Sequence, residues 1–365
     1  MRLIYITRVQ LPSRAAQSLQ ILAMARAFHD CLGEGFRLIS CEGDRRASTV
    51  PPFHWEVRKG ARGQWLRYGA LFVETFVRAR ADRGGVIFTR DIALALSAVL
   101  AGGRAVYEAH KPPASRVAAW MCRLLAKSSN FKLVAISGAL AEFYRAAYKL
   151  PEARVLVAHD GVFPEDYRAL RRTGRVTIRK ELNLALDKLL VVHTGSLYKG
   201  GAELYEHVAR AGDNDILFLH IGGTEADRER WSEHYRGLDL DNVVFLPHMP
   251  PERARLYQMA ADLLFYVTTR ESPMYWCTSP LKIFEYMATG TPILGACIGS
   301  VGEVLNDGNA YCFDPDRPES IGEAFMRYRQ DAALAQRKAD QALSEVEEKY
   351  SWGERARKIA SFALD

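Results

Sequence analysis

One segment of the chain combines a helix start, a carboxylate and a helix stop at spacings that could bind an anion. It has the sequence TSPLKIFEYMATGTP, from Thr278 to Pro292. Ser279 is a favourable N-cap, Pro280 suits the first helical position and Gly290 suits the C-cap. A helix begun in this way presents free backbone N–H groups and a positive dipole end, which together form an anion site.

Glu285 falls on the second turn of this expected helix. A carboxylate there could accept two hydrogen bonds from vicinal hydroxyls, such as those of a ribose. The alternative is an ordinary helix that starts with Ser-Pro and carries an exposed glutamate. Local physics favours neither interpretation.

A second segment, Val191–Gly201, is an expected strand that runs into a glycine-rich turn. The backbone around Gly195 and Ser196 could approach a phosphate closely, and Lys199 would supply positive charge for a diphosphate. Gly222, after the next expected strand, is similarly permissive. Each turn alone is weak evidence, because glycine-rich turns after strands are common and the chain has no P-loop sequence.

Two acidic pairs, Asp239–Asp241 and Asp314–Asp316, resemble metal sites. Both lie in polar loop contexts and far in sequence from the phosphate-type turns, so solvated loops are the favoured interpretation. We therefore expect no catalytic metal and no cofactor. The charge of a leaving phosphate would instead be met by Lys199 and the helix N-terminus before Glu285.

Composition limits the class of protein. The chain is 48% hydrophobic and 25% charged, as expected for a soluble globular enzyme. Its longest apolar run, Ile92–Ala101, is about half of the ~20 residues that a spanning helix needs. The first residues predict a strand and not a signal peptide. Six cysteines without CxxC spacing predict buried side chains and not disulfides or metal ligands. We expect a cytoplasmic location.

Short β-branched or apolar runs alternate with amphipathic stretches along the chain. This alternation predicts parallel sheets covered by helices, and 365 residues predict two domains. The expected strands are 3–6, 36–39, 85–89, 105–108 and 132–136 in the first half, and 189–193, 216–221, 243–246, 263–267 and 292–295 in the second. The expected helices are 18–28, 65–80, 92–100, 116–126 and 140–148, then 202–210, 228–235, 252–260, 280–289 and 321–330.

The polar, Arg-rich stretch 163–179 shows no clear periodicity, so we expect the domains to be 1–170 and 171–350. Ser351 and Glu354 predict a capping box that starts a C-terminal helix over 351–365. Trp352, Ala356 and Ile359 follow at helical spacing, so this helix should bury one face. It could cover the second sheet or, as we expect, cross back to the first domain.

Charge is divided unequally between the two halves. Residues 1–170 carry 25 Lys and Arg against 14 Asp and Glu, a net charge of +11, and residues 171–365 carry 24 against 29, a net charge of −5. A basic half suggests an anionic partner such as a membrane surface, an acidic glycan or a diphosphate lipid. A solvated Arg-rich surface is the alternative. Nucleic acid is a poor candidate, because the basic residues form no dense cluster with interleaved aromatics.

The order of several motifs resembles family 4 retaining glycosyltransferases with the GT-B fold. In the second half these are VVHTGSLYKGG, FLHIGG, NVVFLPHM, SPLKIFEYMATGTPILG and VGEVLNDGNAYCFDP. In the first half VIFTRDIALAL, AVYEAH, LVAISGALAEFY and VLVAHDGVFPEDY are similar to segments of that family in the same order. The resemblance covers essentially the whole chain. It implies two Rossmann-like domains that face each other across a cleft.

The resemblance also implies roles for single residues. Glu285 matches the carboxylate that holds the nucleotide ribose, and the backbone of Ser279, Pro280 and Leu281 matches the turn that receives the donor diphosphate. Lys199 matches a base that neutralises the departing phosphate. These matches imply that the 171–350 domain binds the nucleotide-sugar donor.

His110 matches a first-domain histidine near the transferred sugar, although without the family it would more often be an ordinary loop histidine. Two positions depart from the family pattern. Cys277 stands where a first glutamate is common, with Glu271 as a possible substitute, and Ser196 stands where a cation is common. These departures concern the catalytic contacts and not the fold.

The leading hypothesis is metal-independent transfer, with retention, of a sugar from a UDP- or GDP-sugar to a glycan or lipid-linked acceptor in polysaccharide or glycolipid synthesis. The 1–170 domain would bind the acceptor, and the protein could sit peripherally on the inner membrane face. The alternatives are a nucleotide-sugar epimerase and a non-catalytic partner subunit that keeps the fold. No GxGxxG motif follows an N-terminal strand, so a dehydrogenase is poorly supported.

Overall fold

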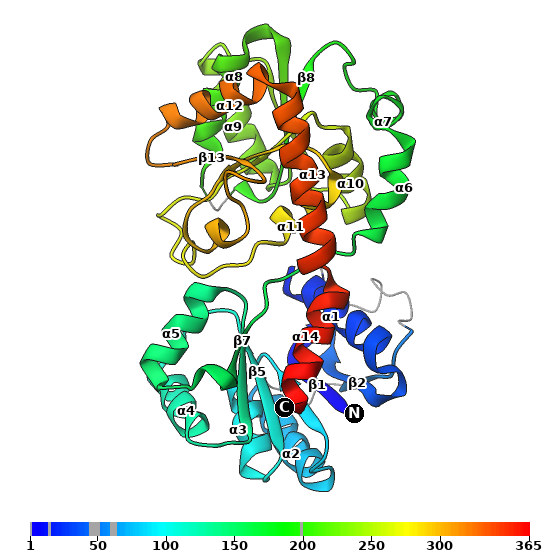
Figure 1. Cartoon of the computed structure of the whole chain (residues 1–365), viewed down its shortest axis with the longest axis vertical. Helices are drawn as coiled ribbons and strands as arrows, with labels where there is room; N and C mark the ends of the chain where they lie inside the picture. The colour runs from blue at the N-terminus through cyan, green and yellow to red at the C-terminus, as the bar shows by residue number, and fades with distance from the viewer. Residues whose placement is uncertain (1, 14–15, 44–51, 59–63, 198–199) are drawn as a thin grey trace. The chain divides into compact units, whose positions relative to one another are not determined.

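Two parallel sheets organise the chain, one in each of its two units (Figure 1). The computed structural model describes residues 2–13, 16–43, 52–58, 64–197 and 200–365. Unit 1 comprises Met1–Asp160 and Trp352–Asp365, and unit 2 comprises Gly161–Ser351. Unit 2 is therefore one continuous stretch, and unit 1 is completed by the C-terminal helix.

Unit 1 contains a seven-stranded sheet in the order β3-β2-β1-β4-β5-β6-β7. Its strands are β1 (Leu3–Leu11), β2 (Phe36–Glu42), β3 (Trp55–Arg58), β4 (Val86–Thr89), β5 (Arg104–Ala109), β6 (Phe131–Ala135) and β7 (Val155–Val157). Its helices are α1 (Ala16–Leu32), α2 (Gln64–Ala81), α3 (Ile92–Leu100), α4 (Arg116–Ala126), α5 (Gly138–Tyr148) and α14 (Trp352–Leu364). Asp91, Ser115 and Ser137 cap α3, α4 and α5, because each side chain accepts a backbone N–H of the first turn.

Unit 2 contains a six-stranded sheet in the order β10-β9-β8-β11-β12-β13. Its strands are β8 (Leu189–Thr194), β9 (Ile216–Ile221), β10 (Val243–Leu246), β11 (Leu263–Tyr266), β12 (Ile293–Ala296) and β13 (Tyr311–Phe313). Its helices are α6 (Glu165–Thr173), α7 (Arg175–Glu181), α8 (Tyr205–Gly212), α9 (Glu225–Gly237), α10 (Pro251–Ala260), α11 (Leu281–Thr289), α12 (Glu319–Gln330) and α13 (Ala332–Lys349).

Both sheets reverse their strand order once, between β1 and β4 in unit 1 and between β8 and β11 in unit 2. In open α/β sheets, ligands bind beyond the carboxyl ends of the strands at such a reversal. The two sheets thus each define one edge at which functional side chains are expected.

The ten strands expected from the sequence are all present, with bounds shifted by a few residues at most except for β1, which is longer. Three strands were not predicted: β3, β7 and β13. Each is three or four residues long and lies at the edge of its sheet. Edge strands are covered on fewer sides, so they need no long apolar run to fold.

The stretch 163–179 was expected to be irregular, and this expectation was wrong. It forms α6 and most of α7, and the units divide between Asp160 and Gly161 instead of at residue 170. Arg179 of α7 is buried and donates to the Ala260 carbonyl. This contact secures α7 to unit 2, so an arginine that suggested a linker has a packing role.

The cysteine prediction needs correction. Cys41, Cys122 and Cys277 are buried and outside any disulfide, as expected, but Cys31 is exposed and Cys297 and Cys312 form a disulfide. Gly295 of β12 pairs with Cys312 of β13, which brings Cys297, just beyond β12, within reach. The pair forms because two neighbouring strands meet, and this pairing is invisible in the linear spacing.

Helix α14 packs along α1 in unit 1. Trp352, Ala356, Ile359 and Ala363 are buried, as their helical spacing predicts. Within the described residues, no helix is both long enough and apolar enough to cross a bilayer.

Candidate functional site

Glu285 in unit 2 lies on α11, which follows β11 at the reversal of the sheet. Its Oε2 atom accepts hydrogen bonds from Gln258 Nε2 at 2.9 Å and from Lys282 Nζ at 3.0 Å. Its side chain is 25% exposed. Since both contacts fall on Oε2, the Oε1 atom is the one with capacity to accept bonds from a ligand.

The carboxyl group of Glu285 is held ionised. Burial raises its pKa, but Lys282, Gln258 and Arg255 together lower the pKa by more than burial raises it, so it lies below its ordinary value. Gln258 itself is buried and also donates to Thr194 Oγ1 at 3.1 Å. This chain of bonds links the charge on α11 to the end of β8.

The first turn of α11 differs in one detail from the sequence prediction. The helix begins at Leu281 with Pro280 as its N-cap, whereas Ser279 was expected to be the cap and Pro280 the first helical residue. Pro280 itself makes no side-chain cap bond, and the first-turn backbone N–H groups of a helix point toward the space where an anion can bind. Gly290 ends the helix in the left-handed region with φ of 71°, as predicted.

The two glycine turns of unit 2 meet beyond the sheet. Gly195 follows β8 and donates to the Ile221 carbonyl at 3.0 Å, and Gly222 follows β9 with φ of 132°. A Cβ added at Gly222 would collide with the Gly195 carbonyl oxygen, so only glycine fits there. Ser196 is half-buried in this loop, whereas Lys199 lies outside the described residues and its predicted role stays a prediction.

One position that departs from the family pattern, Cys277, lies in the loop before α11 together with its proposed substitute Glu271. Cys277 is fully buried, and burial raises the pKa of its thiol to about 11. Glu271 is exposed in the same loop. A buried neutral thiol cannot supply the charge of the missing glutamate.

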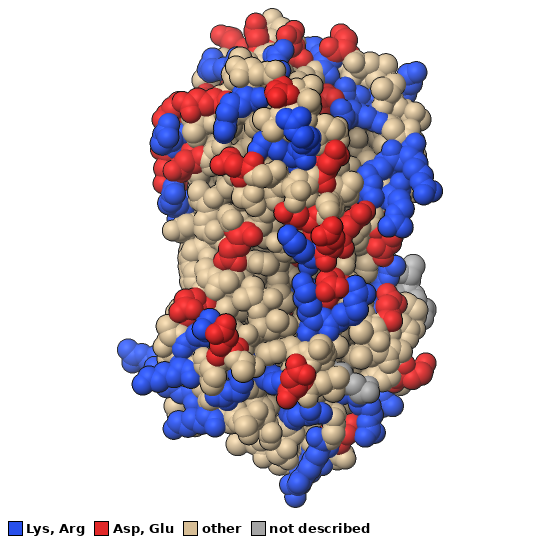
Figure 2. Space-filling model, in the orientation of Figure 1, with Lys and Arg blue, Asp and Glu red and all other residues tan. Residues whose placement is uncertain are grey.

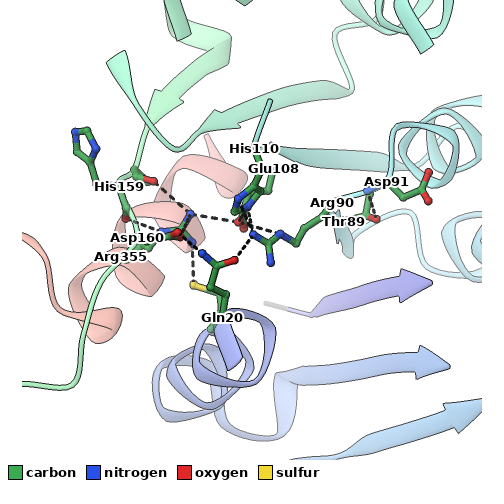
Figure 3. Close-up of polar contacts among 11 residues, drawn as sticks. Gln20, Thr89, Arg90, Asp91, Glu108, His110, His159, Asp160 and Arg355 are labelled. Carbon is green, nitrogen blue, oxygen red and sulfur yellow. Dashed lines mark hydrogen bonds and ion pairs between the residues drawn. The ribbon is translucent and has the colours of Figure 1, made fainter. Parts of the chain in front are cut away.

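His110 in unit 1 follows β5 directly and belongs to a cluster of buried polar side chains (Figure 3). Arg90 Nη2 lies 2.7 Å from His110 Nδ1, and Glu108 Oε1 contacts His110 Nε2. The same Arg90 Nη2 also contacts His110 Nε2, so both ring nitrogens are in contact with Arg90 or Glu108. Burial and Arg90 lower the pKa of His110 below its ordinary value, which keeps the ring neutral.

Glu108 is the centre of this cluster. Its Oε1 lies 3.5 Å from Arg90 Nε and 3.4 Å from Arg355 Nη2, and the residue is 3% exposed. Burial raises the pKa of Glu108, but Arg355 and Arg90 outweigh it and hold the pKa well below its ordinary range. Glu108 therefore stays ionised and fixes the orientation of His110.

Arg355 reaches the cluster from α14 and is 2% exposed. It also donates to the His159 carbonyl at 2.8 Å and lies 3.9 Å from Asp160 Oδ1. Gln20 of α1 closes the cluster, because it donates to Asp160 Oδ2 at 2.6 Å and accepts from Arg90 at 3.1 Å. Figure 3 shows Gln20, Arg355 and Arg90 converging on the acidic groups from separate elements.

The acidic pairs that resembled metal sites in the sequence do not form a metal site in the described residues. Asp314 and Asp316 both pair with Arg270 on the surface. Across the described parts of the chain, no three His, Cys, Asp or Glu side chains are grouped so that they could hold a metal ion. Independence from metal stays a prediction.

Comparisons with known proteins bear on this geometry. Residues 188–331 match the family described as "Glycosyl transferases group 1". The structure of Anabaena Alr3699/HepE in complex with UDP superposes with a TM-score of 0.74 at 17% identity, covering 99% of each chain. WaaG, a glycosyltransferase involved in lipopolysaccharide biosynthesis, superposes with a TM-score of 0.66 at 17% identity, covering 98% of this chain and 99% of that one.

The chain has the GT-B fold. Its GT-B fold class, predicted from the sequence, is thus confirmed, and the residues that match the glycosyltransferase group 1 family lie within unit 2. The chain is 23% identical over 233 residues to an uncharacterized glycosyltransferase, MJ1607, of Methanocaldococcus jannaschii, over 62% of this chain and 58% of that protein. It is 26% identical over 250 residues to a D-inositol 3-phosphate glycosyltransferase of Streptomyces griseus, over 62% of this chain and 52% of that protein. The chain spans only about half the length of these relatives.

Within this GT-B fold, the structure brings Gly195, Ser196 and Gly222 to one edge of unit 2 and shows how Glu285 is held. Sequence reasoning missed the residues that orient the predicted ones: Gln258 and Lys282 in unit 2, and Arg90, Glu108, Asp160 and Arg355 in unit 1. One signal was available, because Arg90 follows β4 directly and Glu108 lies near the carboxyl end of β5. Nothing in the sequence pointed to Arg355.

Proposed function

We propose that this protein transfers a sugar from a nucleoside-diphosphate sugar, with unit 2 as the donor site. The observation that carries the proposal is the state of Glu285: ionised, anchored through one oxygen, and able to accept through the other. The same unit contributes the N-terminus of α11 and two glycine turns. A carboxylate suits a ribose diol, and the helix start and turns suit a diphosphate.

UDP-sugars are the first donors to test, with GDP-sugars second. The support for UDP is that the similar HepE structure is a complex with UDP. Binding is testable by thermal shift and calorimetry with UDP, GDP, ADP and their sugars. A ligand at 100 times its Kd should stabilise the folded state by about 2.7 kcal/mol. If none of these nucleotides shifts the melting temperature, the donor site is wrongly assigned.

We infer that unit 1 contributes His110 near the transferred sugar and meets the acceptor. The neutral imidazole of His110, with 23% of its side chain exposed, would line this part of the site without adding charge. The acceptor is proposed to be a glycan or a lipid-linked species in polysaccharide or glycolipid synthesis, at the inner membrane face. Retention of configuration and independence from metal belong to the same proposal.

Product analysis tests the reaction class. A transferase should form a new glycoside only when donor and acceptor are both present, and NMR of its anomeric proton should show retention. Conversion of the donor to another nucleotide sugar without acceptor would contradict the proposal and indicate an epimerase. Nucleotide binding without turnover on a panel of acceptors would indicate a non-catalytic subunit.

A further inference from the structure

Helix α4 of unit 1 presents a basic and apolar stripe to solvent. Arg116, Trp120, Arg123 and Lys127 recur at the spacing of one helix face, and Val117 lies beside them. Trp120 is 54% exposed and Val117 61% exposed. The opposite face of α4 packs inward through Cys122, Leu125 and Ala126. The stripe is therefore the outer side of a firmly packed helix.

Helix α2 carries a second exposed apolar stripe. Leu66, Ala70, Val73, Val77 and Arg80 share one face by the same spacing, and all five are exposed. Leu66 is 65%, Val73 61% and Val77 57% exposed. A monomer that is fully solvated gains nothing from displaying a row of valine and leucine side chains.

The two stripes belong to one layer of helices. Helix α2 packs along α3, and α3 packs along α4, so the three lie in a row in unit 1 (Figure 1). Leu100, at the end of α3, is 62% exposed. We call the exposed side chains of α2 and α4 in these two stripes the outer face.

The segment that carries the outer face has more basic than acidic residues. Residues 64–127 contain ten Lys and Arg but four Asp and Glu. All four acids are already engaged, since Glu74, Asp82 and Asp91 pair with arginines and Glu108 is buried. Within the described residues, neither Arg116 nor Arg123 forms an ion pair. Figure 2 shows Lys and Arg side chains gathered on the side of unit 1 where α4 lies.

We propose that the outer face docks unit 1 on an anionic lipid bilayer. Val117, Trp120 and the α2 stripe would enter the interfacial region, while Arg116, Arg123 and Lys127 contact the headgroups. Tryptophan suits this depth because its ring is apolar and its N–H is polar. A second copy of the chain is a poorer occupant, because a symmetric contact would place the same cations against each other.

Docking through α4 would also serve the reaction, and this part of the inference rests on the proposed function. Helix α4 begins six residues after His110. A lipid-linked acceptor held in the bilayer would therefore lie near the residue proposed to contact the transferred sugar. The docking itself does not depend on that function.

Vesicle co-sedimentation of the full chain tests the proposal. Binding is expected to phosphatidylglycerol–phosphatidylcholine vesicles and not to pure phosphatidylcholine, and it should fade as salt shortens the Debye length from about 10 Å at 0.1 M to about 3 Å at 1 M. Arg116→Glu with Arg123→Glu should weaken binding by at least about tenfold, because each basic residue contributes on the order of 1 kcal/mol. The matched control is Arg230→Glu with Arg236→Glu on α9, which should bind as wild type.

The apolar part is tested separately. Trp120→Ser with Val117→Ser should also lower vesicle binding, whereas Val176→Ser on α7, at a site 59% exposed, should not. Equal losses in variants and controls, or equal binding to both vesicle types, would overturn the docking. Concentration-dependent self-association that is abolished by Trp120→Ser would overturn it in favour of a dimer.

The same proteins are titrated with UDP. Vesicle binding without nucleotide binding would leave the docking intact and remove the proposed function. Nucleotide binding without vesicle binding would do the reverse. The two failures are thus distinguishable.

Discussion

The two units place glutamates near the same edge of their sheets but use them differently. In unit 1, Glu108 is buried between Arg90 and Arg355, and its charge is paired with these two arginines. In unit 2, Glu285 is 25% exposed, and its protein contacts occupy one of its two oxygens. The first arrangement orients a neighbouring side chain, and the second leaves acceptor capacity for a ligand.

The histidines at these edges show a related difference. His110 is held by charged groups and keeps 23% of its side chain exposed. His193 at the end of β8 is buried and stacks on His220 with ring centroids 5.1 Å apart. Unit 1 thus buries ions at this edge, whereas unit 2 buries neutral imidazole rings. Each arrangement predicts its own response to mutation and pH.

The largest effect is expected in unit 1. Arg355→Met should destabilise the protein by about 3–5 kcal/mol, because it leaves Glu108 and Asp160 buried with one cation fewer. Urea unfolding monitored by circular dichroism measures this. Arg357→Met on the same helix is the control, since Arg357 is 64% exposed and should contribute less than about 1 kcal/mol. Equal effects of the two changes would show that the ion cluster has no special energetic role.

In unit 2, stability should decline on acidification. Burial lowers the pKa of His193 to about 4, whereas an unfolded histidine titrates near 6.5. The unfolded state binds more protons in this range, so stability is full above about pH 6.5 and falls as pH drops toward 4. The full loss from this residue is about 3 kcal/mol. Unfolding free energies measured between pH 7 and 4.5 should fall less steeply in His193→Gln, and an unchanged slope would contradict the assignment.

The open carboxylate is tested by Glu285→Gln. The amide keeps the size of the side chain but loses charge-assisted bonds, each worth roughly 1.5–3 kcal/mol. We expect kcat/KM to fall by about tenfold to a hundredfold and UDP affinity to fall with it. Glu252→Gln, on an exposed turn of α10, is the control. Activity within twofold of wild type would mean that Oε1 is not used.

The smallest effect is expected from chelation. If the N-terminus of α11 and nearby cations meet the phosphate charge, excess EDTA should leave the initial rate unchanged. The rate is compared with and without EDTA, and after adding Mn²⁺ or Mg²⁺. Loss of activity with rescue by either ion would show that the donor site of unit 2 needs a metal.

Local sequence predicted ten strands and most helices with approximate bounds, but not β3, β7, β13, α6, α7 or α13. The central strands are apolar runs, and most helices show apolar residues at helical spacing. Both patterns are visible in the sequence alone, so these elements were predictable. The C-cap at Gly290 was predictable for a related reason, because glycine is favoured at positive φ. Motif order carried the fold class and pointed to Glu285, Gly195, Gly222 and His110.

Only the tertiary structure decided which side chains meet. The short edge strands β3, β7 and β13 are held by neighbours, and the Cys297–Cys312 disulfide follows from pairing of β12 with β13. Arg355 and Glu108 are far apart in sequence, and they meet because α14 returns to unit 1 and packs along α1. The ionisation state of a buried group depends on the side chains that the tertiary fold brings next to it. Periodicity describes one element at a time, so it contains no information about that encounter.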